Sequence, residues 1–258
     1  MATDPSRSRI NVLEKTFSVL EAFSASTPEL NLEGLSELTG IGKSSLQRLT
    51  HTLCELDYLR RTDKRGYYAL THRPLVLSFA YLRFDELARA ASPLLGRLAD
   101  QTELRADLTL LDGTDIVYAV RIPSRVETFS ISPAGRRWPA LASASGRAIL
   151  SGLPEETVDA VFAQTELPAA TTRSILDKET IRRAIGQAKV DGYAYQIGEV
   201  LEGAAAVACA INNASGLPFA AISLGTSVSE LENIERRREL AATVINAANS
   251  LSSLSFVN

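Results

Sequence analysis

The stretch Ile41-Gly-Lys-Ser-Ser-Leu-Gln-Arg-Leu-Thr-His-Thr-Leu-Cys-Glu-Leu56 decides how the N-terminal part of the chain folds. Its apolar residues recur at helical spacing, which predicts a helix with one buried face: Leu46, Leu49, Leu53 and Leu56. The residues away from that face are of the kinds that bind phosphates and base edges: Ser44, Ser45, Gln47, Arg48, His51 and Thr52. The stretch therefore predicts a helix that packs on one side and can meet nucleic acid on the other.

A second short helix is expected just ahead of this one. Asn31 is a helix-capping residue type, and the apolar pattern after it is Leu32, Leu35 and Leu38. Gly40 can adopt the positive φ that commonly ends a helix. A further helix is expected over residues 11–24, so the region predicts a three-helix unit that contains a helix–turn–helix.

The start of the polar helix carries its own signal. Ser44 and Gln47 have the spacing of a capping box, which predicts that Ser44 caps the helix. A capped helix start exposes backbone N–H groups and the positive end of the helix dipole, which suits a phosphate, and Lys43 lies just ahead. Alternatives stay open: Ser44 could be a cap alone, Arg48 could contact guanine or only a phosphate, and His51 could face DNA or solvent.

Residues 58–70 predict a β-hairpin with a charged tip at residues 62–66. Between Lys43 and Arg65 the chain has six basic and three acidic residues, a local charge of +3 in a chain of net charge -3. A helix–turn–helix followed by a basic hairpin is the winged arrangement, in which a helix enters the major groove and the hairpin contacts the DNA backbone or minor groove. The predicted DNA-binding residues are Lys43, Ser44, Ser45, Gln47, Arg48, Thr52, Arg60, Arg61, Lys64 and Arg65. Two alternatives stay open: the three-helix unit could be a protein-interaction domain, and the charged hairpin could simply be solvated.

The length and composition limit the number of domains and the classes of protein that the chain can belong to. With 258 residues, 45% hydrophobic and 22% charged, the chain is long enough for two globular domains. Cys54 and Cys209 are expected to be small buried hydrophobes, and with two histidines in the chain neither a metal cluster nor another cofactor is expected. The N-terminus lacks an apolar signal core and no apolar run approaches the roughly 20 residues that span a bilayer, so a cytoplasmic protein is expected.

We expect four segments along the chain. They are a flexible arm (1–8), a winged helix–turn–helix domain (9–72), a linker helix (73–91) and an effector-binding domain (92–258). The linker helix is expected to run unbroken from Leu75 to Ala91, and Pro93 is expected to open a separate helix.

The second domain is predicted to be α+β, with an antiparallel sheet and helices on one of its faces. Alternating residues at 105–111 and 115–121 flank Asp112-Gly113, which predicts a hairpin. Apolar strands are expected at 204–211 and 218–224, and a further strand at 128–132. Residues 132–140 are expected to form a loop, and the helices are expected at 145–151, 154–164, 177–190 and 229–251.

Several stretches together carry a resemblance to a known family. In the N-terminal part they run from Leu13 through Leu35-Ser-Glu-Leu-Thr-Gly-Ile-Gly-Lys-Ser-Ser-Leu-Gln-Arg-Leu49 to Tyr68-Ala-Leu70. In the C-terminal part there are five, in order: Leu110-Leu-Asp-Gly113, Gly135-Arg-Arg-Trp-Pro139, Ser143-Ala-Ser-Gly-Arg-Ala-Ile-Leu150, Gly192-Tyr-Ala-Tyr195 with Glu199 and Gly203, and Gly216-Leu-Pro-Phe-Ala-Ala-Ile-Ser223. Over nearly its whole length the chain resembles the IclR (isocitrate lyase regulator) family of bacterial transcription factors.

The resemblance implies a winged helix–turn–helix joined by a helix to a GAF/PAS-like effector-binding domain. It implies a dimer or a dimer of dimers that binds a palindromic DNA operator and responds to a small organic acid. The ligand pocket would lie between the sheet and the segment around Ser143–Ala148. The predicted effector-binding residues are Thr109, Ala140, Ser143, Gly146, Gln196, Ala206 and Ser223.

The chain departs from the family pattern at four pocket positions. Small-acid-binding members often have Asp at the position of Gln196, Cys at Ala206, His at Leu141 and Ser at Gly225. These differences predict a less acidic, more apolar and roomier pocket, and hence an aromatic or alicyclic acid rather than a two- or three-carbon keto acid. Other residues that could reach the pocket are Asp107, Tyr118, Arg121 and Trp138, although Tyr118 and Trp138 could belong to the core and Arg121 could be a surface residue.

An enzyme is not expected. Gly-x-Ser-x-Gly is absent, both histidines lie in or beside the predicted DNA-binding module, and no Gly-rich phosphate loop is present. The competing function is a small-molecule sensor that acts through protein partners instead of DNA, and the basic hairpin argues against it.

Overall fold

The computed structural model describes residues 10–24, 26–124, 133–254 and 256. The chain forms two compact units, residues 1–81 and 82–258, and each is described by itself. The predicted arm at 1–8 and the predicted strand at 128–132 lie outside the described residues.

Cys54 and Cys209 are free thiols, and burial raises the pKa of Cys209 to about 11. No described helix is both long and apolar enough to cross a membrane.

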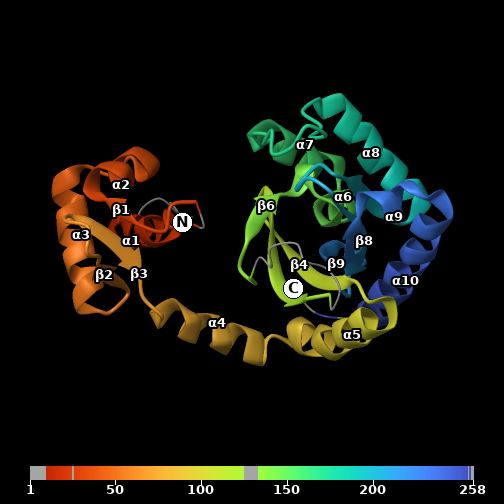
Figure 1. Cartoon of the computed structure of the whole chain (residues 1–258), viewed down its shortest axis with the longest axis horizontal. Coiled ribbons are helices and arrows are strands. Elements are labelled where there is room, and N and C mark those ends of the chain that lie inside the picture. The colour runs from red at the N-terminus through yellow and green to blue at the C-terminus, as the bar shows by residue number, and fades with distance from the viewer. Residues whose placement is uncertain (1–9, 25, 125–132, 255, 257–258) are drawn as a thin grey trace, which may run out of the picture. The chain divides into compact units, whose positions relative to one another are not determined.

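The first unit is a winged helix–turn–helix, as predicted (Figure 1). Three helices and a small sheet pack around one core, to which α1, α2 and α3 contribute Val19, Leu35 and Leu46. The central strand β3 pairs antiparallel with β1 and β2. The elements are α1 (Asn11–Glu21), β1 (Leu30–Asn31), α2 (Leu32–Thr39), α3 (Lys43–Glu55), β2 (Leu59–Arg61) and β3 (Tyr67–Leu70).

The turn between α2 and α3 forms largely as the sequence predicts. Asn31 Oδ1 accepts a hydrogen bond from Gly34 N at 2.8 Å, and Gly40 takes a φ of 68° after the end of α2. The predicted cap at Ser44 is wrong, because α3 starts at Lys43 and its N-cap residue is Gly42, which has no side chain to cap with. Ser44 is instead exposed on the first turn.

The buried face of α3 also differs at one position from the predicted stripe. Leu46 and Leu53 are buried and Leu49 is half-buried, but Leu56, the residue after the helix, is exposed. Thr50 takes its place inside, and its hydroxyl donates to the carbonyl of Leu46 at 2.8 Å. A buried threonine is tolerated because this bond satisfies its hydroxyl.

The helix predicted to run from Leu75 to Ala91 is two helices, α4 (Arg73–Phe84) and α5 (Glu86–Thr102). The break is at Asp85, which has extended backbone and accepts a hydrogen bond from Ala88 N at 2.7 Å as the N-cap of α5. A side chain that caps a new helix cannot lie in the interior of a continuous one. Pro93 lies inside α5 and opens no helix of its own, which corrects the second expectation for this region.

The second unit is built on a six-stranded antiparallel sheet of order β6-β5-β4-β9-β8-β7. Its strands are β4 (Arg105–Asp112), β5 (Asp115–Ile122), β6 (Arg137–Pro139), β7 (Ala194–Ile197), β8 (Ala204–Asn212) and β9 (Pro218–Ser227). Strand β6 lies in a segment predicted to be a loop, where it pairs with β5 at the sheet edge. The two apolar strands β8 and β9 each have a neighbour on both sides, and together they form the longest pairing of the sheet.

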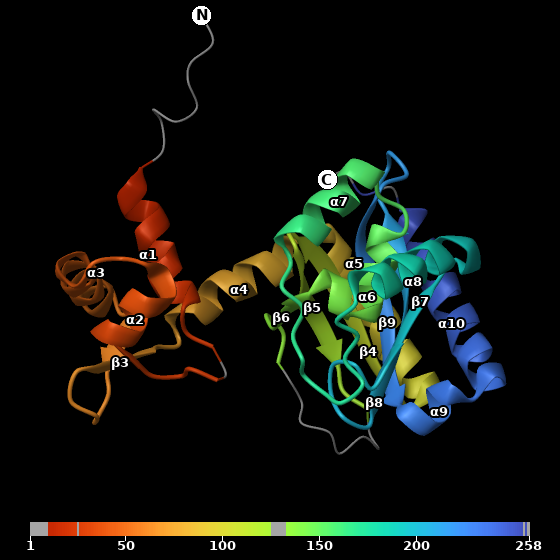
Figure 2. The ribbon, with the colours of Figure 1, turned by 90° about the horizontal axis from the view of Figure 1, so that it is seen from above.

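Helices cover both faces of this sheet, so the expectation of helices on one face is wrong (Figures 1 and 2). On one face α5 and α10 pack against Val207, Ile222 and their neighbours. On the other face α6 packs its alanines against Ala208. The remaining helices are η2 (Ala140–Ala142), α6 (Ala144–Leu150), α7 (Glu155–Gln164), α8 (Lys178–Asp191), α9 (Val228–Glu232) and α10 (Ile234–Ser252).

The predicted last helix is also divided. Asn233 separates α9 from α10, and its Oδ1 accepts hydrogen bonds from Glu235 N at 3.0 Å and Arg236 N at 3.1 Å. As at Asp85, an N-cap side chain restarts the helix within an apolar pattern that is otherwise continuous.

Candidate nucleic-acid interface and ligand pocket

Helix α3 presents a continuous polar surface. Ser45 is half-buried, and the other predicted contact residues of the helix are exposed: Lys43, Ser44, Gln47, Arg48 and Thr52. Two surface contacts with carboxylates border them: an ion pair of Lys43 Nζ with Glu33 Oε1 at 3.3 Å and a contact of His51 Nε2 with Glu55 Oε1 at 3.4 Å. Exposed pairs of this kind contribute at most about 1 kcal/mol, so a DNA phosphate can displace the carboxylate from Lys43 at small cost.

A groove runs between α1 and α3 beside this surface. It has a volume of about 320 Å³ and is lined by Asn11, Val12, Lys15, Ser45, Arg48, Leu49 and Thr52. The groove brings Lys15 and Asn11 next to the predicted contact residues Ser45, Arg48 and Thr52. Sequence reasoning missed the two α1 residues, although their i, i+4 spacing places them on one helix face.

The wing places four cations on an exposed hairpin, and all of Arg60, Arg61, Lys64 and Arg65 are exposed. Its tip is closed by hydrogen bonds from Thr62 N to Tyr67 O and from Tyr67 N to Lys64 O, both 3.0 Å. Lys64 Nζ lies 3.6 Å from the centre of the Tyr67 ring, a cation–π contact that holds this side chain against the hairpin.

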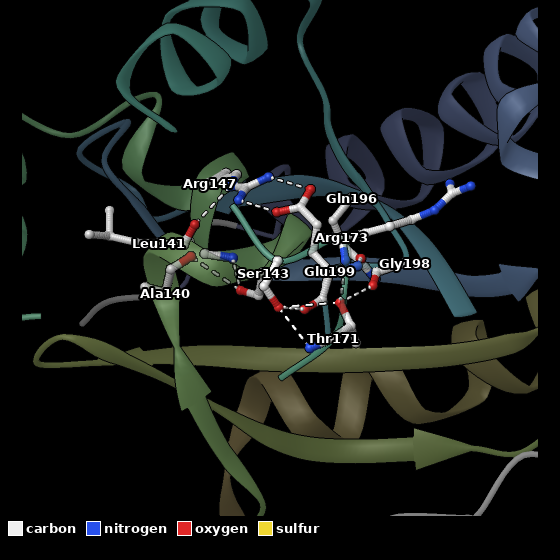
Figure 3. A network of polar contacts seen from close by, with 11 residues as sticks. Ala140, Leu141, Ser143, Arg147, Thr171, Arg173, Gln196, Gly198 and Glu199 are labelled. Atoms are coloured by element: carbon white, nitrogen blue, oxygen red, sulfur yellow. Dashed lines mark hydrogen bonds and ion pairs between the residues drawn. The ribbon is translucent and has the colours of Figure 1, made fainter. Parts of the chain in front are cut away.

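In the second unit a network of polar contacts is built around a buried arginine (Figure 3). Arg147 of α6 is 2% exposed and pairs with both carboxylate oxygens of Glu199, Nη1 to Oε1 at 3.0 Å and Nη2 to Oε2 at 2.6 Å. Its Nε donates to the carbonyl of Leu141 at 2.8 Å. This bidentate pair fixes the segment after β7 against α6.

The same network orients Gln196. Its Oε1 accepts a hydrogen bond from the backbone N–H of Glu199 at 2.9 Å, so its Nε2 must point elsewhere. Among the described residues Nε2 has no hydrogen-bond partner. A neighbouring loop secures the segment further, because Ser174 Oγ donates to Glu199 O at 2.9 Å and Thr171 Oγ1 to Gly198 O at 2.6 Å. Gln196, which is 5% exposed, therefore presents a donor of fixed direction on the edge strand β7.

Three of the predicted effector-binding residues hold η2 against α6. Ser143 Oγ caps α6 by accepting from Gly146 N at 2.9 Å, and it donates to the carbonyl of Ala140 at 3.3 Å. A Cβ on Gly146 would overlap the backbone of Ala140. The small size of Gly146 thus permits a close approach of two backbones and opens no space on that side, and the hydroxyl of Ser143 is already engaged.

The other predicted effector-binding residues share the sheet face that α6 covers. Gln196 pairs with Ala206, Ala206 with Gly225, and Ser223 with both Ala208 and Asp107. Thr109 lies two residues beyond Asp107 on the same face, and its hydroxyl donates to Ala221 O at 3.3 Å. The structure therefore places Thr109, Gln196, Ala206 and Ser223 on one face of the sheet.

Strands β4 and β5 add a charged cluster to this face. Asp107 is 1% exposed, and its carboxylate accepts from Arg105 Nε at 3.1 Å and from Arg121 Nε at 3.0 Å. The side chain of Arg121 is only 8% exposed, which argues against the surface alternative. It also lies 4.0 Å from the ring of Tyr118, where burial, and secondarily the Asp107 carboxylate, raises the pKa of the phenol and keeps it protonated at neutral pH.

One departure from the family pattern has a different effect from the one predicted. At Gly225 a Cβ would overlap Nη2 of Arg105, so the space left by the missing side chain is filled by a guanidinium. The pocket is therefore neither roomier nor more apolar at this point, and Leu141, another such position, is fully buried in the core. Sequence reasoning missed Arg105, since its contact joins strands that lie over 100 residues apart in the chain.

Trp138 of β6 lies across from Ile116 and packs against the core on this side of the sheet. Its indole Nε1 is buried and has no hydrogen-bond partner within the described part of the chain. Arg136 stacks 4.9 Å from its ring.

Comparison with known proteins covers both units. The family described as "Bacterial transcriptional regulator IclR C-terminal" matches residues 79–253, and the "IclR helix-turn-helix domain" matches residues 12–63. The chain is 28% identical to the Pca regulon regulatory protein of Pseudomonas putida over 240 residues, which cover 93% of this chain and 82% of the relative. It is 30% identical to the p-hydroxybenzoate hydroxylase transcriptional activator of Acinetobacter baylyi over 248 residues, which cover 94% and 90%.

Among solved structures, the chain is similar to an IclR homologue of Microbacterium hydrocarbonoxydans complexed with 4-hydroxybenzoate. The TM-score is 0.69 at 21% sequence identity, with 93% of this chain and 99% of the other covered. At this identity the likeness concerns the fold.

Proposed function

The chain belongs to the IclR family of transcriptional regulators, and we propose that it is a regulator whose affinity for a DNA operator, or whose recruitment of polymerase there, is changed by a small organic acid. The observation that carries the proposal is the division of its polar residues. The α3 face and the wing form an exposed, basic surface in one unit, whereas the second unit buries oriented polar groups between its sheet and α6.

DNA contacts are assigned to the exposed residues of α3 and to the wing. Arg48 and Gln47 suit base edges, while Arg60, Arg61 and Arg65 suit phosphates. The test is selection of bound duplexes from a random pool, followed by anisotropy titration of the enriched sequence. We expect a palindromic site. Binding of the acid without any preference among duplexes would instead favour a sensor that acts through protein partners.

A palindromic site needs two recognition helices, and α4 offers a surface on which a second copy can dock. It has no buried residue, and it exposes six large apolar side chains: Leu75, Val76, Leu77, Phe79, Tyr81 and Phe84. Apolar side chains gathered on one helix mark an interaction surface. In sedimentation experiments Phe79→Glu should give monomers, whereas Val190→Glu, at an exposed position on α8, should leave the dimer intact. A monomeric parent chain would contradict the assignment.

An aromatic monocarboxylic acid is the proposed effector. The homologue from Microbacterium hydrocarbonoxydans carries 4-hydroxybenzoate, and the Acinetobacter relative is named for activating p-hydroxybenzoate hydroxylase. In this chain Tyr118 and Trp138 supply aromatic surface on the α6 side of the sheet. Calorimetric titration with 4-hydroxybenzoate, benzoate and pyruvate tests the class, and tighter binding of pyruvate would contradict it.

A further inference from the structure

The groove between α1 and α3 gathers polar side chains that have no partner in the protein. Its volume is about 320 Å³. Five polar side chains line it: Asn11 and Lys15 from α1, and Ser45, Arg48 and Thr52 from α3. Among the described residues, none of these five side chains hydrogen-bonds to another group of the protein. Polar side chains that converge on one groove without pairing among themselves are available to an outside partner.

The charge of this groove is positive and unopposed. Lys15 and Arg48 line it, and no carboxylate does so among the residues that the structure describes. A neighbouring cation of α3 is already neutralised, because Lys43 Nζ lies 3.3 Å from Glu33 Oε1. Within the described part of the chain, Lys15 and Arg48 have no such ion pair. Two like charges that share a groove repel each other, and an anion bound between them offsets that repulsion.

The core of the first unit fixes the two walls of the groove. Val19 lies one helical turn after Lys15 and belongs to the same buried cluster as Leu46 of α3. Leu49 packs against this cluster and also lines the groove. Lys15 is half-buried, which is typical of a lysine whose apolar stem lies along the protein while its ammonium reaches solvent. The groove therefore needs little rearrangement to bind an anion.

A phosphate of the DNA backbone fits this groove best. The groove shares Ser45, Arg48 and Thr52 with the proposed DNA-binding face of α3. When a helix lies in the major groove, the anions that border it are backbone phosphates. Their oxygens accept hydrogen bonds only, and the groove offers matching donors: an ammonium, two hydroxyls and an amide.

We propose that Lys15, aided by the amide of Asn11, binds a backbone phosphate of the operator in this groove and so positions α3 against the duplex. The inference rests on the proposed DNA-binding function, because it adds α1 to the protein–DNA interface. Ser45 and Thr52 donate hydrogen bonds to the same phosphate from the opposite wall. Once this phosphate fixes the depth of α3, the longer side chain of Arg48 can extend to a base edge.

The first test compares Lys15→Gln with Lys15→Arg in anisotropy titrations of the full-length protein on the selected operator. Lys15→Gln should weaken binding about 5-fold, to the operator and to unrelated duplexes alike. It should also lower the slope of log affinity against log salt by about 0.9. Lys15→Arg keeps the charge and should retain most of the affinity and of the slope. Lys189→Gln, at an exposed cation of α8, is the matched control and should change neither.

A second test locates the phosphate itself. Single phosphates of the operator are replaced one at a time by uncharged methylphosphonates. One position in each half-site should weaken binding of the parent protein and of Lys15→Arg, but should cost Lys15→Gln nothing further. Positions that the wing contacts should remain sensitive in all three proteins. A misfolded variant would show no sensitive position at all, so the pattern separates loss of the contact from loss of structure.

The outcomes separate this inference from the proposed function. If Lys15→Gln keeps the salt slope of the parent protein and stays sensitive at every position, the role of Lys15 is wrong and DNA binding still stands. A lower slope without a position that loses its sensitivity would overturn the direct contact. A loss confined to operators of one sequence would also overturn it, because Lys15 would then contact a base. A parent protein that binds no duplex would overturn the proposed DNA-binding function and the phosphate site with it.

Discussion

The wing and the Arg147–Glu199 pair use the same kinds of side chain under opposite conditions. The wing arginines are exposed to solvent, whereas Arg147 is 2% and Glu199 8% exposed. Water and salt screen charges on the wing, so we expect each of them to contribute a small and nearly independent amount to DNA binding. A buried pair acts as a unit, because removal of one member leaves the other charged and desolvated. The comparison teaches that similar residues should give very different mutational effects in the two units.

The largest effect is expected at the buried pair. Arg147→Met leaves Glu199 without its bidentate partner and should lower the free energy of unfolding by about 3–5 kcal/mol. Chemical denaturation measures this loss. The control is Asp159→Asn, which removes an exposed partner from Arg182 (2.7 Å) and should cost at most about 1 kcal/mol. If both variants lost the same free energy of unfolding, the proposed difference between buried and exposed charges would be wrong.

The second prediction concerns the coupling of the two units through α4. Insertion of one glycine after Phe79 should weaken this helix and interrupt transmission, while the acid still binds its pocket. The effect of the acid on operator affinity, expected to be roughly 5- to 150-fold in the parent chain, should disappear. Anisotropy titrations with and without acid measure it. Regulation that survives the insertion would exclude α4 as the transmitter.

The third prediction distinguishes base recognition from phosphate binding among the proposed DNA-binding residues. If Arg48 binds guanine through two hydrogen bonds as proposed, Arg48→Ala should cost about 1–3 kcal/mol of discrimination at one base pair. Titration of operators that differ at single positions measures this loss. A uniform loss across all operator variants would reassign Arg48 to the phosphate backbone.

The smallest effect is expected at a single wing charge. Arg61→Ala should weaken binding to every sequence alike and should lower the slope of log affinity against log salt by about 1. Lys189→Ala, which removes an exposed cation from α8, is the matched control and should leave the slope unchanged. A sequence-dependent loss at Arg61 would show that the wing reads bases.

The first unit, residues 1–81, is the easier of the two to predict from the sequence. Helical periodicity located α3, and Asn31 and Gly40 marked the ends of α2, because these signals act within a few residues. The differences between prediction and structure are also local. The N-cap residue of α3 is Gly42 and not Ser44. Asp85 and Asn233 each cap a new helix and so divide a predicted one, and the continuous apolar pattern around them gives no sign of the break.

The second unit depends on contacts that leave no local signal. Arg105 meets Gly225, and Arg147 meets Glu199, across long stretches of chain, so no spacing in the sequence connects them. Strand β6 follows a turn that contains Gly135 and ends at Pro139, so these turn-forming residue types conceal it in the sequence. The placement of helices on both faces could have been predicted, because β8 is almost entirely apolar and a strand that is polar on neither side is buried on both.

The central claim is that acid binding in the second unit and operator binding in the first are coupled, and coupling between two equilibria must be reciprocal. The direct measurement is the affinity for 4-hydroxybenzoate with and without saturating operator DNA, beside the affinity for operator with and without the acid. We predict that both affinities change by the same factor, between about 5 and 150. An affinity for the acid that is the same with and without the operator would contradict the account.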